Sequence, residues 1–221
     1  MKYGMFLFLC FILLLEVQII KSHRCGIHLE EKSKKMLNRK IKTSDDWQPL
    51  RIHFDFSYIE SIDGFSIDKL KMLREQVMPR VAKTFKRLLK VKPVVGNLTL
   101  INNPCGKIQT IPDMYINDGV SSDLIIFVTI EDPNSLSNNT LASAYHCLQD
   151  EKTFRPLSGF VKFNPNFETG YKNSSDYLVD ITIHEVMHVL AMNPGLFGDW
   201  MVVNSQGTSG GAKNSIEILK L

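Results

Sequence analysis

Hydrophobic and polar residues alternate over residues 50–59, in the stretch LRIHFDFSYI. In an extended chain, alternation places every second side chain on one face, so this stretch predicts a β-strand with one buried face. The apolar side chains of that face are Leu50, Ile52, Phe54, Phe56 and Tyr58.

Three further stretches have strand patterns. Residues 96–102 (GNLTLIN) predict a short strand, and residues 124–130 are almost continuously apolar, which is typical of a strand buried on both faces. Residues 158–165 alternate and end in a proline, which lacks a backbone donor. They predict a short strand at the edge of a sheet.

Residues 67–91 predict a long amphipathic helix, because apolar side chains recur every three or four positions. Lysines and arginines lie mostly on the opposite face, and Pro79 is expected to kink the helix. The apolar face comprises Leu70, Leu73, Val77, Val81, Phe85 and Leu88.

A second helix is expected after Asn173, Ser174 and Ser175, which suit a helix N-terminus. It is apolar nearly all round, which predicts a buried helix. The order strand, helix, strands, helix predicts a layered α/β or α+β domain. The apolar residues of this second helix are Ile181, Ile183, Val186, Met187, Val189 and Leu190.

The two ends of the chain differ from this body. Residues 1–22 contain an apolar run that is shorter than the roughly 20 residues of a membrane span. They predict a cleaved secretory signal peptide, with an uncleaved anchor or a buried helix as the alternatives. Residues 23–46 are polar and predict a weakly ordered segment. Residues 198–221 include a stretch rich in glycine and serine, and we expect them to be unstructured.

Composition narrows the functional classes. The chain has 221 residues, which suits one domain, and a net charge of +3, which is too small to indicate a nucleic-acid partner. The basic residues within 71–92 predict a solvated helix face, with a polyanion-binding stripe as the alternative. Three glycosylation sequons, at Asn97, Asn138 and Asn173, agree with secretion.

The most specific chemical pattern is HEVMH, residues 184–188, which reads H-E-x-x-H. Histidines four residues apart lie on one helix face, so His184 and His188 can bind one Zn2+ ion. Glu185 can accept a proton from water at that ion and act as the general base of peptide hydrolysis. The alternative is a core helix with hydrogen-bonded histidines.

A catalytic zinc site usually has three protein ligands, and this motif supplies two. The metzincin extension H-E-x-x-H-x-x-G-x-x-H is not followed, since Ala191 replaces the glycine and Pro194 the last histidine. No histidine follows His188. Asp199 and Glu217 are the only carboxylates after the motif, and their spacing favours neither as a ligand.

Several stretches, in order over residues 23–197, resemble the leishmanolysin family of zinc metalloproteases. They are SHRCGIH, WQPLRIHFDFS, MPRVAKTFKRLLKVKPVVGNL, CGKIQTIPDMYINDGVSSDLIIFVT, LASAYHCLQD and SGFVKFNP, followed by the H-E-x-x-H helix. The resemblance implies a metzincin fold, in which a twisted sheet covers the active-site helix and an edge strand aligns the substrate.

The resemblance also implies a propeptide over residues 23–46, in which Cys25 binds zinc as an inhibitory cysteine switch. Cys105 and Cys147 are then left to pair as a disulfide, and the alternative is that Cys25 pairs with one of them. Residues 47–197 correspond to the N-terminal part of the protease domain. The third histidine and the methionine turn of the family would lie further on, so we expect a C-terminally truncated protein.

The sequence therefore predicts a secreted or cell-surface zinc metalloendopeptidase that is made as a zymogen and acts on protein or peptide substrates. The first alternative is a truncated, catalytically inactive protein that acts in binding or adhesion, although the intact Glu185 argues against it. A weaker alternative is a short peptidase with Asp199 or Glu217 as the third ligand.

Overall fold

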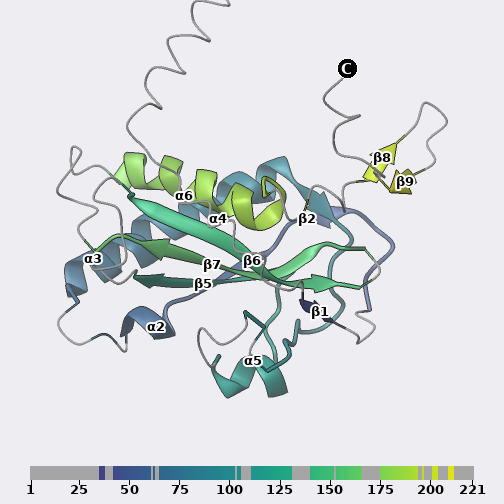
Figure 1. Ribbon diagram of the computed structural model, residues 1–221, viewed down its shortest axis with the longest axis horizontal. Coiled ribbons are helices and arrows are strands. Elements are labelled where there is room, and N and C mark those ends of the chain that lie inside the picture. Colours follow the sequence, from purple (N-terminus) through teal and green to yellow (C-terminus); the bar gives the residue numbers. More distant parts are fainter. Residues whose placement is uncertain are drawn as a thin grey trace, which may run out of the picture.

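The computed structural model (Figure 1) describes residues 35–37, 42–60, 62, 65–102, 104–105, 111–130, 140–151, 153–165, 175–193, 196, 201–203 and 209–211. Its elements, in chain order, are β1 (Lys35–Leu37), β2 (Gln48–Pro49), β3 (Ile52–Asp55), α2 (Ser57–Glu60), α3 (Ile67–Lys71), the π-helical η2 (Met72–Val77), α4 (Met78–Leu88), β4 (Lys90–Val91), α5 (Asp113–Asn117), β5 (Leu124–Ile130), β6 (Ala142–Asp150), β7 (Pro156–Phe163), α6 (Ser175–Leu190), β8 (Met201–Val203) and β9 (Ser209–Gly211).

A five-stranded mixed sheet organises the fold, with the strand order β1-β6-β7-β5-β3. Strand β6 runs antiparallel to β7, and every other neighbouring pair is parallel. Helices α4 and α6 cover one face of the sheet, and α5 lies on the opposite side (Figure 1). The predicted α+β layered class is confirmed.

The sheet has a hydrophobic core on each face, and β5 contributes to both. Leu124, Ile126 and Val128 point into the core under α4 and α6, which we call the helix face. Ile125 and Phe127 point into the other core, which we call the loop face. This alternation follows from strand geometry, and it confirms the prediction of a strand buried on both sides.

Strand β7 is internal, between β5 and β6, so the prediction of an edge strand for residues 158–165 is wrong. Pro165 suggested an edge because it lacks a donor, but β7 ends at Phe163, so no ladder hydrogen bond is lost. The antiparallel strand β6, which was not predicted, covers the other side of β7.

The strand predicted over residues 50–59 ends at Asp55. The Asp55 carboxylate accepts hydrogen bonds from the backbone N–H (3.1 Å) and the hydroxyl of Ser57, and these bonds begin the short helix α2. Leu50 and Phe56 are buried as expected. The prediction therefore identified inward-facing residues but extended the strand too far.

The helix predicted over residues 67–91 is interrupted near the expected position. The π-helical segment η2 ends at Val77, two residues before Pro79, and the N–H of Met78 reaches back five residues to the carbonyl of Leu73. The wider turn occurs beside the residue that lacks a backbone donor. The helix ends at Leu88. The sequence predicts Leu88 on the buried face, but its side chain is 63% exposed, so this part of the prediction is wrong.

Helix α6 is buried on one side only, which corrects the prediction of burial all round. Asp176, Asp180 and His184 follow one another at intervals of four residues and are exposed. The opposite side contacts β6, β7, α4 and η2. No helix in the described part of the chain has both the length and the apolar character needed to cross a membrane.

Residues 96–102 do not form the predicted strand. Leu98 makes a single antiparallel bridge with Val120, and the N–H of Leu100 donates to the carbonyl of Tyr115 (2.8 Å). The pairing stops after this bridge, because the segment that contains Val120 turns at Gly119, which has a φ of 68°. The residues before that turn belong to α5 and not to a strand. The segment still contributes Leu98 and Leu100 to the loop face.

Parts of both terminal segments have regular structure, which the sequence did not predict. Strand β1, from the polar segment 23–46, pairs parallel with the last residues of β6. Strands β8 and β9 form a small antiparallel sheet within residues 198–221. The adjacent Val202 and Val203 favour a strand there despite the glycine-rich surroundings.

Candidate metal centre

Helix α6 carries the three residues of the motif and lies directly on the sheet. Its approach depends on Gly159 of β7. A Cβ atom at that position would lie 2.5 Å from Cγ1 of Val189 and 2.8 Å from the backbone oxygen of Tyr145. Only glycine fits there without a shift of its neighbours, so Gly159 determines how closely the histidine-bearing end of α6 packs on the sheet.

The side chains of His184 and His188 converge. Their Nε2 atoms are 3.1 Å apart, and their rings are nearly perpendicular, at 85°. Nδ1 of His188 lies 2.5 Å from the carbonyl oxygen of Met192. A carbonyl only accepts hydrogen bonds, so we assign the proton to Nδ1 of His188. In this neutral tautomer Nε2 carries a lone pair, and that lone pair is directed at His184.

This geometry fits two ligands of one zinc ion. Two imidazole nitrogens that face each other at this distance share either a proton or a cation. Zinc binds histidine nitrogen at about 2.0–2.1 Å, so two ligands of a tetrahedral ion lie roughly 3.3 Å apart. A backbone carbonyl on the other ring nitrogen, here that of Met192, is the usual second-shell partner of a zinc-binding histidine.

Burial differs sharply among the three motif residues. Glu185 is fully buried, His188 is 8% exposed, and His184 is exposed. The site therefore combines an imidazole that solvent can reach with a carboxylate that the protein shields from bulk water. A carboxylate held this way can exchange a proton with a molecule bound beside the histidines, while bulk water is kept away.

Among the described residues, no group of three or more His, Cys, Asp or Glu side chains is placed to hold a metal ion. Three residues considered as ligands lie outside those ranges: Cys25, Asp199 and Glu217.

The other predicted site residues are partly visible. Cys105 and Cys147 form a disulfide with a Cα–Cα distance of 4.5 Å, which is the pairing that the family resemblance implied. Asn97 is exposed, and its side-chain amide donates to the carbonyl of Asp118 (3.1 Å). Asn138 and Asn173 lie outside the described residues.

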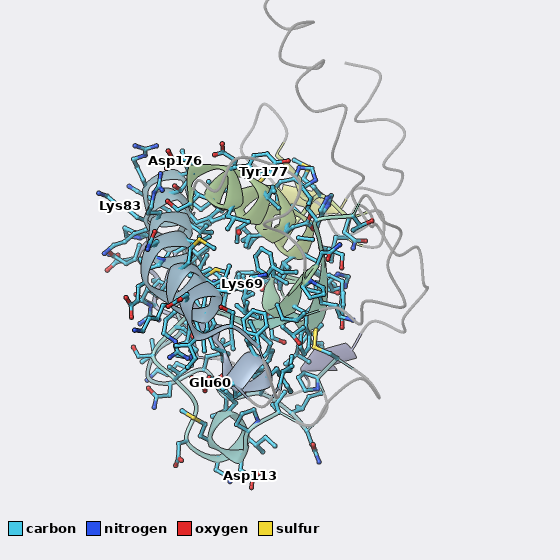
Figure 2. All side chains as sticks on the ribbon, turned by 90° about the vertical axis from the view of Figure 1, so that its left-hand side faces the viewer. Glu60, Lys69, Lys83, Asp113, Asp176 and Tyr177 are labelled. Carbon is cyan, nitrogen blue, oxygen red and sulfur yellow. A yellow bond between two sulfur atoms is a disulfide. The ribbon has the colours of Figure 1, made fainter. Side chains whose placement is uncertain are left out.

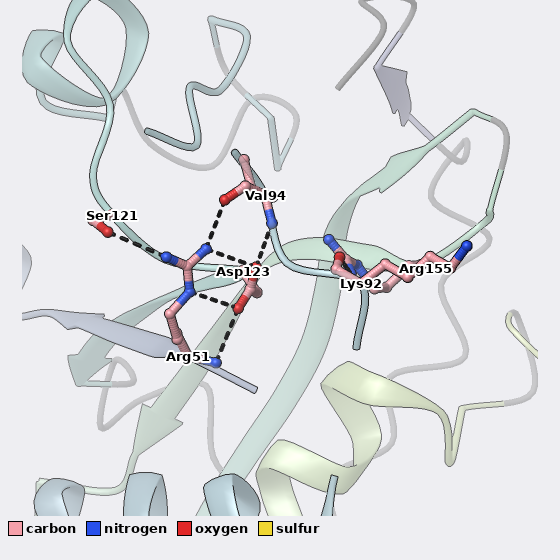
Figure 3. Close-up of polar contacts among 6 residues, drawn as sticks. All are labelled: Arg51, Lys92, Val94, Ser121, Asp123 and Arg155. Carbon is pink, nitrogen blue, oxygen red and sulfur yellow. Dashed lines mark hydrogen bonds and ion pairs between the residues drawn. The ribbon is translucent and has the colours of Figure 1, made fainter. Parts of the chain in front are cut away.

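A polar cluster that sequence analysis missed lies on the loop face (Figure 3). The carboxylate of Asp123, which is fully buried, accepts four hydrogen bonds, from the backbone N–H groups of Val94 and Arg51 and from two guanidinium nitrogens of Arg51. Arg51 also donates to the carbonyl of Val94 (2.8 Å) and to Ser121 (3.3 Å).

The charges of this cluster stabilise each other. Burial tends to raise the pKa of Asp123, but the hydrogen bonds from Arg51 and the two backbone N–H groups lower that pKa below its ordinary value. The hydrogen bond to Asp123 raises the pKa of Arg51. The nearby Arg155 has a lowered pKa, because burial disfavours its charge. The cluster is therefore a structural ion pair that joins the starts of β3 and β5.

A second network links β3 to α5. The hydroxyl of Tyr115 donates to Asp55 (2.6 Å) and lies 2.9 Å from Nε2 of His53. Burial, and then the hydrogen bond to Asp55, raise the pKa of Tyr115, while burial lowers the pKa of His53. Burial and the charge of Asp55 raise the pKa of Tyr58 to about 12. None of these groups belongs to the H-E-x-x-H site.

A mixed sheet that carries an H-E-x-x-H helix, with both histidines directed at one point, is the arrangement expected of a zinc-dependent metalloprotease. Comparison with protein families agrees, since the family model for leishmanolysin matches residues 55–215. The chain belongs to the leishmanolysin family, whose members are zinc-dependent metalloproteases that act on peptide substrates. A search of curated proteins gave no match.

Proposed function

We propose that this chain is a secreted zinc endopeptidase in which His184 and His188 bind the metal and Glu185 is the general base. One observation carries the proposal: the two Nε2 atoms meet at 3.1 Å while the Met192 carbonyl holds Nδ1 of His188. That hydrogen bond presets the tautomer a metal ligand needs.

Each motif residue has a separate part in the proposed reaction. Zinc, when bound, supplies a Lewis acid that polarises the scissile carbonyl and makes water more acidic. Glu185 accepts a proton from the attacking water and returns it to the departing amine. The Met192 carbonyl holds the His188 ring in one orientation. The exposed position of His184 leaves the approach open to a peptide.

The zinc content of purified variants tests the proposed roles. His184→Ala and His188→Ala are each expected to lower zinc affinity by more than about 10-fold, because losing even a hydrogen-bond partner of a ligand costs about 10- to 100-fold. Asp180→Asn, an exposed change one turn earlier on α6, is the matched control and should bind zinc normally. If both histidine variants bind zinc as tightly as Asp180→Asn, the two histidines are not the ligands.

The general base is tested separately from metal binding. Glu185→Gln should keep its zinc and lose about 10²- to 10⁴-fold in the rate of peptide hydrolysis, the usual contribution of acid–base catalysis. If the wild-type chain binds zinc but cleaves no peptide, even after removal of its N-terminal segment, the inactive binding or adhesion protein becomes the better interpretation.

We also propose that the N-terminal segment keeps the enzyme latent. Cys25 is the proposed zinc-blocking residue, and the position of β1 supports a second contact. Lys35–Leu37 lies along the outer edge of β6 at Leu148–Asp150, where an extended peptide would otherwise add to the sheet. Three residues in parallel pairing form a weak contact, which suits a segment that must later be displaced.

Proline at Met36 tests this second contact. Met36→Pro removes a backbone donor from β1, so amide hydrogen exchange at Leu148–Asp150 should accelerate while the rest of β6 stays protected. Asp45→Pro, at an exposed position in the same segment, is the control. Cys25→Ser should instead raise peptidase activity without changing this exchange. Equal exchange in Met36→Pro and the wild type would remove β1 from the mechanism.

Secretion is proposed from residues 1–22, and two observations support it. The disulfide between Cys105 and Cys147 suits an oxidising compartment. Asn97 is exposed and accessible for glycosylation. Expression in a eukaryotic secretory system should release a glycosylated chain whose mass falls on enzymatic deglycosylation. Asn97→Gln should remove one glycan from it, and a protein retained in the cytosol would contradict the proposal.

A further inference from the structure

The outer side of α4 and the chain just after it form a dense positive surface. Six cations lie within 13 residues, with no acidic residue among them. All six are exposed, and Figure 2 shows Lys83 projecting away from the body of the molecule. We call this set the basic face: Arg80, Lys83, Lys86, Arg87, Lys90 and Lys92.

Most of the basic face is not neutralised by the described part of the protein. Arg80 pairs with Asp176 of α6 (2.7 Å), and Lys92 lies 3.9 Å from Asp45. The other four cations form no ion pair with any described residue. Asp176 therefore offsets charge at the Arg80 end of the basic face, and Asp45 offsets charge at the Lys92 end.

Bulky apolar side chains are exposed at that same end. Trp47 and Leu88 are each 63% exposed, and Leu89 is 37% exposed. The pairing of Gln48 with Val91 in the small β2–β4 sheet brings Trp47 beside the chain that leaves α4. The N–H of Leu50 donates to the carbonyl of Leu89 (3.0 Å) in the same region.

Cations along a helix face, with an exposed tryptophan beside the chain that follows it, suit one kind of partner. We infer that the basic face, with Trp47, binds the surface of a membrane that contains anionic lipids. Lysines and arginines are attracted to anionic headgroups, while an exposed Trp side chain inserts at the boundary of the acyl region. A soluble polyanion would use the cations alone and would leave Trp47 without a role.

This docking is compatible with peptide hydrolysis and independent of it. Asp176, which pairs with Arg80, lies two turns before His184 on α6, or about 12 Å along the helix axis. Membrane binding through α4 would therefore bring the metal centre close to the surface. Because the basic face contains no motif residue, the inference stands or falls separately from the proposed zinc chemistry.

Co-sedimentation of the full chain with vesicles tests the inference. We expect binding to phosphatidylcholine vesicles that contain 30% phosphatidylserine, and little binding to phosphatidylcholine alone. Lys86→Glu changes the charge by two and should weaken binding about 30-fold. Lys71→Glu makes the same charge change on α3, more than a Debye length away, and should weaken it less than about 2-fold.

The apolar contribution has its own measurement. In a Trp200→Phe background, Trp47 fluorescence should shift to the blue on addition of the anionic vesicles. In the wild-type background, Trp47→Ser should weaken binding without changing its salt dependence. Equal binding by Lys86→Glu and Lys71→Glu would overturn the inference. It would also be overturned if a sulfated polysaccharide bound to the basic face while the vesicles did not, because the surface would then be a polyanion site.

Discussion

The two faces of the central sheet are covered by different kinds of structure. On the helix face, the regular helices α4 and α6 cover the sheet (Figure 1). The side chains of the core between them and the sheet are mainly aliphatic. On the loop face, the cover consists of the five-residue helix α5 and irregular chain, held by aromatic side chains and a disulfide. The aromatic cluster there includes Tyr58, Tyr115, Phe127 and Phe160, with ring centroids 5.2–5.7 Å apart.

The difference follows from where backbone groups find their partners. A helix satisfies its own N–H and C=O groups, so α4 and α6 need only an apolar side towards the sheet. Irregular chain must find partners elsewhere. On the loop face, Asp123 supplies acceptors for the N–H groups of Val94 and Arg51, and Arg51 supplies a donor for the carbonyl of Val94. The comparison teaches that a buried carboxylate with a partly exposed arginine can satisfy backbone groups where regular secondary structure is missing.

Two buried carboxylates, one on each face of the sheet, show how the two faces differ in function. Asp123 and Glu185 are both fully buried. Asp123 accepts four hydrogen bonds and is fixed as a structural anion. Glu185 instead lies in a helix between two histidines that present nitrogen atoms to a shared point. We therefore expect changes on the loop face to alter stability alone, and changes on the helix face to alter metal binding as well.

The largest expected effect comes from Asp123→Ala. Removing Asp123 leaves Arg51 and two backbone N–H groups without their acceptor. This should cost about 3 kcal/mol of unfolding free energy, the lower end of the range for a fully buried pair, because the Arg51 side chain is 37% exposed. Urea unfolding measures this loss. Zinc affinity should stay within about 2-fold, because no motif residue contacts the cluster. Asp118→Ala, at an exposed position nearby, should change stability by less than about 0.5 kcal/mol.

The pH dependence of the same variant is a further check. The folded-state pKa of Asp123 is lowered, so its stabilising contribution is complete above the unfolded pKa of about 3.9. That contribution is lost as pH falls towards the lower folded pKa. The difference in unfolding free energy between wild type and Asp123→Ala should therefore shrink in acid. A difference that stays constant down to pH 2 would show that the charge of Asp123 is not responsible.

Gly159→Ala should have an intermediate effect on stability and a direct effect on the metal centre. The new methyl group would lie 2.5 Å from Val189 and 2.8 Å from the backbone oxygen of Tyr145, so α6 must move away from the sheet. Overpacking of this kind costs about 1–3 kcal/mol. Because Val189 adjoins His188, zinc affinity should also fall, by about 10-fold.

A double mutant locates the cause of that effect. Val189→Ala removes the side-chain clash but not the contact with the Tyr145 oxygen, so adding it to Gly159→Ala should restore part of the zinc affinity. If Gly159→Ala lowers stability yet leaves zinc affinity unchanged, the packing of α6 on the sheet does not control the site, and the two faces differ less than we propose.

The helix face could largely be predicted from sequence, because its signals are local. Helical spacing identified Leu73, Val77, Val81 and Phe85, all of which are buried. The H-E-x-x-H spacing alone predicted that two histidines would share one side of a helix, and their Nε2 atoms do converge. What the spacing did not give was the Met192 carbonyl, because a backbone group leaves no mark in the residue pattern.

The loop face could not be predicted, because its contacts join residues far apart in sequence. Arg51 and Asp123 each precede a strand, and they become neighbours only because Ile52 of β3 pairs with Leu124 of β5. Nothing in the sequence near either residue indicates that pairing. Gly159 did carry a usable signal, since a glycine inside a strand pattern often marks a close approach of another element.

The smallest expected effect concerns His53, on the loop face. Burial lowers its folded-state pKa below that of the unfolded chain, so the folded protein favours the neutral ring. The unfolded state therefore binds more protons than the folded state as pH falls below about 6.5, and stability declines as the pH falls.

His53→Gln keeps a polar group near the hydroxyl of Tyr115 but does not titrate, and we expect it to change stability at pH 7.5 by about 1 kcal/mol or less. Urea unfolding from pH 7.5 to 5, with zinc present throughout, should show a shallower decline in the variant. An equal decline in both proteins would mean that His53 titrates as it does in the unfolded chain, and the loop face would then depend on its ion pair and disulfide without this third polar contact.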